Sequence, residues 1–194
     1  MKSFSLRLII VTLFIVTTHS ALAQEKEIPG APLQLSLFPP LQLRSSKTPI
    51  AGLRLGIFAK NVEMSGIGIG IINWTSEDIS ALQWGVFNYT GGTAVGIQWG
   101  IANIVHDNFI GWQASAYNWN AGNTVGLQSG VFNGEGGNIT GVQFGLCNYS
   151  HSIIGLQLGL LNITEKLHGI QIGVLNIASG KESLPVLPII NAAF

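Results

Sequence analysis

The stretch Gly141-Val-Gln-Phe-Gly-Leu-Cys-Asn148 decides the fold, because its eight-residue pattern recurs along most of the chain. The pattern is Gly, apolar, Gln, apolar, Gly, apolar, apolar, Asn, and its residues are numbered here as positions 1 to 8. Self-similarity at a short fixed period is the signature of a repeat architecture. Clear copies begin at Gly96, Gly126, Gly141, Gly155 and Gly169, and looser copies begin at Gly52, Gly66, Ala81 and Gly111.

Within each copy, apolar residues alternate with Gly and Gln, which is the period-two signal of a β-strand. Positions 2, 4 and 6 are apolar in almost every copy, and the residue two places before the leading Gly (position −1) and position 9 are commonly apolar. Each copy therefore contains about eleven strand-like residues. Polar segments such as Thr75–Asp78 and Glu135–Asn138 separate the copies and have the Gly, Asn, Asp and Ser chemistry of turns.

The Gln at position 3 and the Asn at position 8 recur every fifteen residues, and the spacing shortens to fourteen near the end. We interpret both as structural residues that describe how the chain pairs with itself. They are Gln83, Asn88, Gln98, Asn103, Gln113, Asn118, Gln128, Asn133, Gln143, Asn148, Gln157, Asn162, Gln171 and Asn176.

The fold class is all-β, with tandem strand-turn repeats of 14–15 residues, and the first interpretation is an antiparallel meander or barrel. In that fold, symmetric turns place the Gln of one strand opposite the second Gly of the next, so a bulky side chain covers a glycine. Strands of this length with one apolar face match transmembrane strands. A closed barrel, however, needs stagger between its strands, and symmetric turns do not supply it.

The alternative is a parallel β-solenoid with one coil per repeat, in which identical positions stack and the Gln and Asn residues form ladders. Stacking explains directly why both amides recur at a fixed register. A solenoid needs at least two bends per coil, and the sequence offers only one polar turn per repeat.

Three segments divide the chain: a signal peptide at 1–23, a Pro-rich leader at 24–51 and a β-repeat domain at 52–194. Lys2 and Arg7 precede a short apolar stretch, and small residues precede Gln24, so cleavage is predicted between Ala23 and Gln24. The leader contains one alternating segment, Leu33–Phe38, that can pair as a strand. We expect the protein to be exported, to the outer membrane or the cell surface.

Composition limits the classes of partner. Only 9% of the residues are charged, the formal net charge is zero, and seven basic and nine acidic side chains follow the predicted cleavage site. The sequence has no cluster of basic residues that could bind the phosphate backbone of a nucleic acid, so nucleic acid is not an expected partner. Mean hydropathy is +0.42, which is apolar for a chain of this length and favours outer-membrane lipid as a partner. A protein or small-molecule ligand is left unknown.

The repeats offer no set of residues for catalysis. The glycines of Gly66–Gly70 coincide with repeat positions and lack the Lys of a phosphate-binding loop. His106, His151 and His168 belong to different repeats and do not form a ligand motif, and Cys147 stands where other copies carry Phe or Leu. We therefore predict a protein that is not an enzyme, with no catalytic residues, no cofactor and no metal site.

The tandem copies ending at Asn162 and Asn176, followed by the Pro-rich ending Leu184–Asn191, resemble a group of bacterial surface repeat-containing proteins of unknown function. Such proteins are found in spirochaetes and other bacteria with an outer membrane. The resemblance covers about 52–194, implies an envelope or surface location, and transfers no functional residue. Departures from the repeat, which suggest less regular packing in the first, second and fifth copies, are Arg54, Gly68, Ala59 and Ser115.

The expected function is that of a non-catalytic cell-envelope β-repeat protein with a structural, pore-like or surface-contact role. The alternative is a secreted β-solenoid that binds a ligand or partner along its Gly and Gln face.

Overall fold

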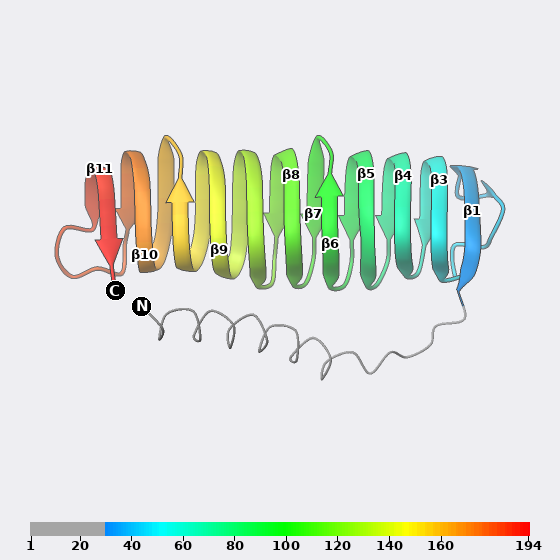
Figure 1. Ribbon diagram of the computed structural model, residues 1–194, viewed down its shortest axis with the longest axis horizontal. Coiled ribbons are helices and arrows are strands. Elements are labelled where there is room, and N and C mark those ends of the chain that lie inside the picture. Colours follow the sequence, from blue (N-terminus) through cyan, green and yellow to red (C-terminus); the bar gives the residue numbers. More distant parts are fainter. Residues whose placement is uncertain (1–29) are drawn as a thin grey trace, which may run out of the picture.

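The computed structural model describes residues 30–194, so the predicted signal peptide and its cleavage site at Ala23 and Gln24 lie outside the described residues. The described chain forms one eleven-stranded sheet, which winds into a row of flattened coils (Figure 1). Within these residues, no helix is long and apolar enough to cross a membrane. The strands are β1 (Ala31–Phe38), β2 (Leu41–Gln42), β3 (Ile50–Asn61), β4 (Met64–Thr75), β5 (Ile79–Thr90), β6 (Ala94–Trp99), β7 (Ala102–Val105), β8 (Phe109–Asn120), β9 (Thr124–Leu158), β10 (Leu161–Ala178) and β11 (Val186–Ala193).

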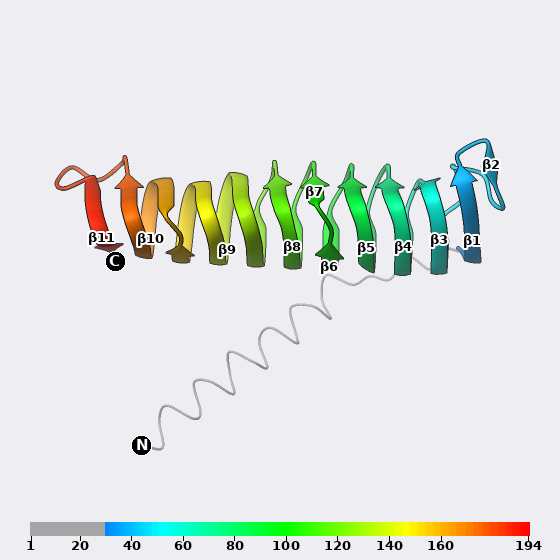
Figure 2. The same ribbon diagram turned by 90° about the horizontal axis from the view of Figure 1, so that it is seen from above.

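Neighbouring coils pair in parallel, and identical repeat positions lie side by side. Gln83 pairs with Gln98, and Asn88 pairs with Asn103. The same register continues from coil to coil, so the coils stack along a single axis (Figure 2). The all-β prediction is confirmed in its alternative form, the parallel β-solenoid, and the antiparallel meander or barrel is wrong. The chain bends twice in each coil and therefore re-enters the sheet in its original direction.

The second bend lies at positions 5 and 6 of the repeat. The fourth coil shows it most clearly, because β6 ends at Trp99 and β7 begins at Ala102, with Gly100 and Ile101 between them. Each coil therefore has two arms that meet at an apolar bend, and a polar turn leads to the next coil. We call these two sides of the solenoid the bend edge and the turn edge.

Glycine allows the coils to approach closely at two repeat positions. At position 1 every glycine has positive φ, as in Gly126 at 141°, and a Cβ there would collide with the carbonyl oxygen of Gly111 in the previous coil. Ala81 is the one residue other than Gly at this position, and its φ is not positive. At position 5, a Cβ on Gly85 would collide with the Asn73 side chain. Gly and Asn therefore occur together at most bends, and in the fifth coil Ser115 replaces the Gly and donates its hydroxyl to Asn118 Oδ1.

Both ends of the solenoid are covered by strands that follow no repeat. β1 pairs in parallel with β3, which confirms the strand predicted at Leu33–Phe38, and β2 folds back on β1. The sheet thus begins inside the Pro-rich leader, 24–51. At the other end β11 pairs antiparallel with β10 and places Asn191 beside Gln171. Short, folded-back strands of this kind limit edge-to-edge association between sheets.

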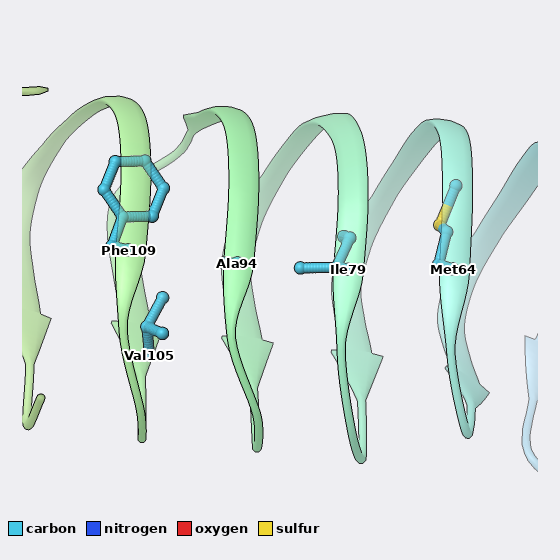
Figure 3. Packing of buried hydrophobic residues seen from close by; sticks show 5 residues of the cluster. All are labelled: Met64, Ile79, Ala94, Val105 and Phe109. Carbon is cyan, nitrogen blue, oxygen red and sulfur yellow. The ribbon is translucent and has the colours of Figure 1, made fainter. Parts of the chain in front are cut away.

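The apolar core lies in the half of each coil nearest the turn edge. One cluster contains Met64, Ile79, Ala94, Val105 and Phe109, whose side chains point into the coils (Figure 3). A second cluster contains Ile139, Ile153, Leu167 and Ala178. Between the two clusters the same interior columns carry polar residues.

Candidate functional site

The Asn residues at position 8 form one continuous buried column. Each amide from Asn73 to Asn162 donates to the side-chain oxygen of the next Asn in the column, over distances of 2.7–3.0 Å. Most of the same amides also donate to the position-4 carbonyl of the next coil, as Asn133 does to Phe144 at 3.0 Å. The Asn column therefore ties the bend of each coil to the bend that follows.

The Gln residues at position 3 form a second buried column. From Gln98 to Gln171, each Nε2 donates to Oε1 of the Gln in the preceding coil, at 2.7–3.3 Å. Gln143, Gln157 and Gln171 also donate to a backbone carbonyl six residues later in their own coil. Gln34 and Asn191 lie in the same column at its two ends and are fully buried.

All fourteen residues assigned a structural role are thus buried, with exposed fractions of 2% or less. This burial leaves the Gln side chains inaccessible to a ligand or partner outside the coils. The coil turns that face inward, because each amide finds its hydrogen-bond partners in the neighbouring coils. Stacked Gln, Asn and apolar side chains occupy the described interior.

The apolar repeat positions lie on the outside. Position 6 is exposed in every coil and is apolar throughout, with 61% of Ile101 and 68% of Val174 accessible. Position 4 is also exposed in several coils, as in Trp84 at 61% and Phe144 at 59%, whereas Leu55 and Leu158 are partly buried there. Near the bend, polar side chains therefore lie inside and apolar side chains outside, which is the reverse of the usual distribution in a water-soluble protein.

An apolar groove runs along the bend edge. Its floor is the position-5 glycine column, and side chains at positions 4 and 6 form its walls. Over the first half of the solenoid the floor contains Gly56, Gly70, Gly85 and Gly100. A similar groove follows the C-terminal coils, over Gly145, Gly159 and Gly173. The bend edge is consequently an apolar surface along most of the length of the solenoid.

Several outer aromatic residues contact their neighbours in adjacent coils. Trp74 stacks on Tyr89 with ring centroids 4.1 Å apart, and the rings of Tyr117 and Phe132 lie 5.1 Å apart. Lys60 places its ammonium group 5.7 Å from the centroid of Trp74. The position-9 aromatic residues lie near the turn edge, at the opposite end of the arm from the bend.

Two ionisable side chains are buried in the interior. Arg54 occupies position 3 of the first coil, and its Nη1 donates to Thr75 Oγ1 at 3.2 Å. Gly68 stands at position 3 of the next coil, where a Cβ would be in van der Waals contact with Arg54 Nη2 at 3.5 Å and a longer side chain would meet the guanidinium group. The glycine therefore leaves space for the longer side chain. Burial lowers the pKa of Arg54 to about 10.

Glu135 is the buried acidic residue, at position 10 of the sixth coil. Its Oε2 accepts a hydrogen bond from Asn120 Nδ2 at 3.3 Å, and the same amide donates to Thr124 Oγ1 at 2.7 Å. Burial raises the pKa of Glu135 to about 8, against the opposing effect of hydrogen bonds from Thr124, Asn120 and Gly137. This polar group separates the two apolar clusters.

His106, His151 and His168 lie in different coils. His151 Nδ1 is 3.1 Å from Glu165 Oε2, and both side chains are exposed. Residues 30–194 contain no group of three or more His, Cys, Asp or Glu side chains placed to hold a metal ion. Cys147 is a partly buried free thiol on the outer face of its arm.

The sequence did not reveal the second bend, because the bend has no turn-like polar composition. The sequence pattern that marks the second bend is the recurrence of Gly at position 5, an apolar residue at position 6 and Asn at position 8. The Asn side chain supplies the hydrogen bonds that polar residues provide in an ordinary turn, and the glycine gives it space. The complementary pair of Arg54 and Gly68 appeared in the sequence only as two departures from the repeat.

Comparisons of the chain with protein-family models, with curated proteins and with solved structures find no match.

Proposed function

We propose that the protein is a non-catalytic component of the bacterial cell envelope, located at the outer membrane or cell surface, where it acts through surface contact. The observation that carries this proposal is the row of exposed apolar side chains along the outside of a solenoid whose Gln and Asn side chains are buried.

An apolar exterior of this extent requires a partner surface. Soluble monomers rarely expose a contiguous apolar patch larger than a few hundred Å². Here apolar rows run along the bend edge through all the coils, from Ile57 to Val174. Contact with lipid, or with an apolar protein surface, removes these side chains from water and stabilises the assembly by about 25 cal/mol for each Å² buried.

The N-terminal sequence supports export. The basic start, short apolar stretch and small residues before Gln24 match a secretory signal. The resemblance to bacterial surface repeat proteins supports the same location. A structural or surface-contact role is preferred to a pore, since amide columns occupy the interior. The secreted, partner-binding alternative would have to use the outer apolar rows instead of the buried Gly and Gln face.

Cell fractionation tests this proposal. The full chain is expressed in a bacterium with an outer membrane, and its periplasmic, membrane and medium fractions are separated. We expect a processed form in the membrane fraction that resists extraction with high salt and is released by detergent. A form that lacks residues 1–23 is the control and should stay in the cytoplasm. Recovery of the processed protein as a soluble periplasmic or secreted species would overturn the envelope assignment.

A further inference from the structure

Charge is distributed unequally around the coil. In residues 30–194, every charged side chain outside the interior lies in a polar turn, beside a turn or in an end cap. Glu77, Asp78 and Asp107 are exposed at the turn edge, whereas positions 1 to 7 of the coils carry no charged residue except the buried Arg54. The solenoid is therefore amphipathic about its long axis, with a polar edge opposite an apolar edge.

The apolar surface covers three sides of each coil. Positions 2 and 4 form the outer face of the first arm, position 6 forms the bend edge, and positions 7 and 9 form the outer face of the second arm. In the third coil these sides carry Trp84, Val86 and Phe87. A second copy packed face to face would cover one side only. A layer of mobile acyl chains can contact all three sides together.

We propose that the solenoid lies parallel to a phospholipid leaflet, with its bend edge inserted among the acyl chains and its turn edge in water. This inference rests on the proposed function, and it names the partner as lipid and the contacting element as the bend edge. Amphipathic helices at membrane interfaces bury their apolar faces by about 5–10 Å. An insertion of that depth would cover positions 4 to 7.

The aromatic residues fit this orientation. Position 9 lies three residues from the bend at position 6, or about 10 Å along an arm at roughly 3.3 Å per residue. Trp74, Tyr89, Trp119 and Tyr149 occupy position 9. Trp and Tyr are enriched at the boundary between acyl chains and headgroups. The position-9 aromatic residues would stand at that boundary while Trp84 and Ile101 contact acyl chains.

The ends of the solenoid disfavour insertion end-on. The loop between β2 and β3 carries Arg44 and Lys47, and the loop between β10 and β11 carries Lys181 and Glu182. A charged side chain in the hydrocarbon region is strongly unfavourable. Both ends of the solenoid carry charged side chains, whereas the bend edge carries none along its length. Insertion through the bend edge, with the long axis parallel to the membrane, is therefore the orientation that buries no charge.

A matched pair of variants in one coil tests the orientation. Ala116 and Ala121 are both exposed, the first at the bend edge and the second in a turn. The purified exported protein is mixed with phosphatidylcholine vesicles, which have no net charge, and the bound fraction is measured by flotation. We expect Ala116→Glu to reduce binding several-fold, Ile101→Glu to reduce it about tenfold or more, and Ala121→Glu to change it less than about twofold. Circular dichroism checks that each variant keeps its β-structure.

Depth is measured with single-tryptophan variants, in which the other four Trp residues are replaced by Phe. We expect lipids brominated in the middle of the acyl chain to quench Trp84 more strongly than Trp119. Equal effects of the two Ala→Glu changes, or stronger quenching of Trp119, would overturn the proposed orientation. If the protein also fractionates with membranes, the proposed function stands and only the orientation fails. Self-association in lipid-free buffer that Ile101→Glu abolishes, without vesicle binding, would instead identify a second copy as the partner.

Discussion

The interior of the solenoid is built differently at its two edges. Toward the bend, the position-8 column repeats the same residue from Asn73 to Asn176 without interruption. Toward the turn, the position −1 column contains residues as different as Ala94, Phe109 and Thr124. Both columns are buried, and both follow the same parallel register.

The difference reflects two kinds of interaction. An Asn ladder depends on directional hydrogen bonds, so each member must present a donor and an acceptor at the same height in its coil. Apolar packing requires only that the total volume be filled, and Phe109 can share space with Ala94 and Val105. A ladder of directly bonded Asn side chains therefore favours the same residue in every coil, whereas an apolar column tolerates substitution.

The largest expected effect is at the bend. Asn133 accepts a hydrogen bond from Asn118 and donates to Phe144 O and Asn148 Oδ1. We expect Asn133→Ala to lower the free energy of unfolding by on the order of 4 kcal/mol, because several buried polar groups lose a partner. In the turn-side column, Ile139→Val should lower it by only about 1 kcal/mol. Denaturant unfolding of both variants measures the contrast, and equal losses would show that the two columns do not differ as described.

The polar group around Glu135, which lies between the two apolar clusters, predicts a pH dependence. Burial raises the pKa of Glu135 from about 4.5 to about 8, so the folded state binds this proton more tightly than the unfolded state does. The stability that comes from this tighter binding of the proton in the folded state is fully present below about pH 4.5 and is lost as the pH rises to about 8. Each pKa unit corresponds to about 1.4 kcal/mol, so a pKa raised this far corresponds to a loss of several kcal/mol.

Glu135→Gln removes this titration and should keep the hydrogen bond from Asn120. We expect the variant to be more stable than the parent at pH 9 and to show a smaller change between pH 5 and pH 9. Unfolding curves at both pH values provide the measurement. A parent protein whose stability rises with pH over this interval would contradict the assignment of a buried, neutral Glu135.

A smaller effect is expected at the first coils, where Arg54 and Gly68 interrupt the Gln column. Arg54→Gln alone should change the free energy of unfolding little. Removal of a buried charge stabilises the fold, but the shorter side chain leaves an empty space beside Gly68, which destabilises it. We expect the double variant Arg54→Gln/Gly68→Gln to have a free energy of unfolding about 1–2 kcal/mol higher than the value obtained by adding the effects of the two single changes. A double-mutant cycle measures this coupling, and strict additivity would indicate that the two positions do not share space.

Much of the architecture could be predicted from residue spacing. The recurrence of Gln98, Gln113 and Gln128 indicated ladders, and the alternation around them indicated strands. Strand direction could not be predicted, because period two is the same for a parallel coil and an antiparallel hairpin. The inward orientation of Gln in the solenoid was also not evident, since Gly and Gln next to polar turns are typical of a surface.

The candidate surface was only partly predictable. The apolar character of positions 4 and 6 was visible in Trp84 and Val86, but their separation into the two walls of a groove depends on the bend at Gly85. The burial of Glu135 was not predictable, because a Glu between Gly134 and Gly136 reads as an exposed turn residue. Its environment arises from contact with Asn120 in the preceding coil and with Thr124 in its own coil.

The central claim, that identical repeat positions stack with their apolar side chains outward, can be tested through Cys147. Leu161 is its register partner in the next coil, and adjacent strands lie about 4.8 Å apart. Nitroxide labels on Cys147 and on Leu161→Cys should therefore touch and show spin exchange. Labels on Cys147 and on Leu175→Cys, which are separated by one coil, should not. An absence of exchange between positions 147 and 161 in the folded protein would contradict the parallel solenoid and the outward apolar rows that depend on it.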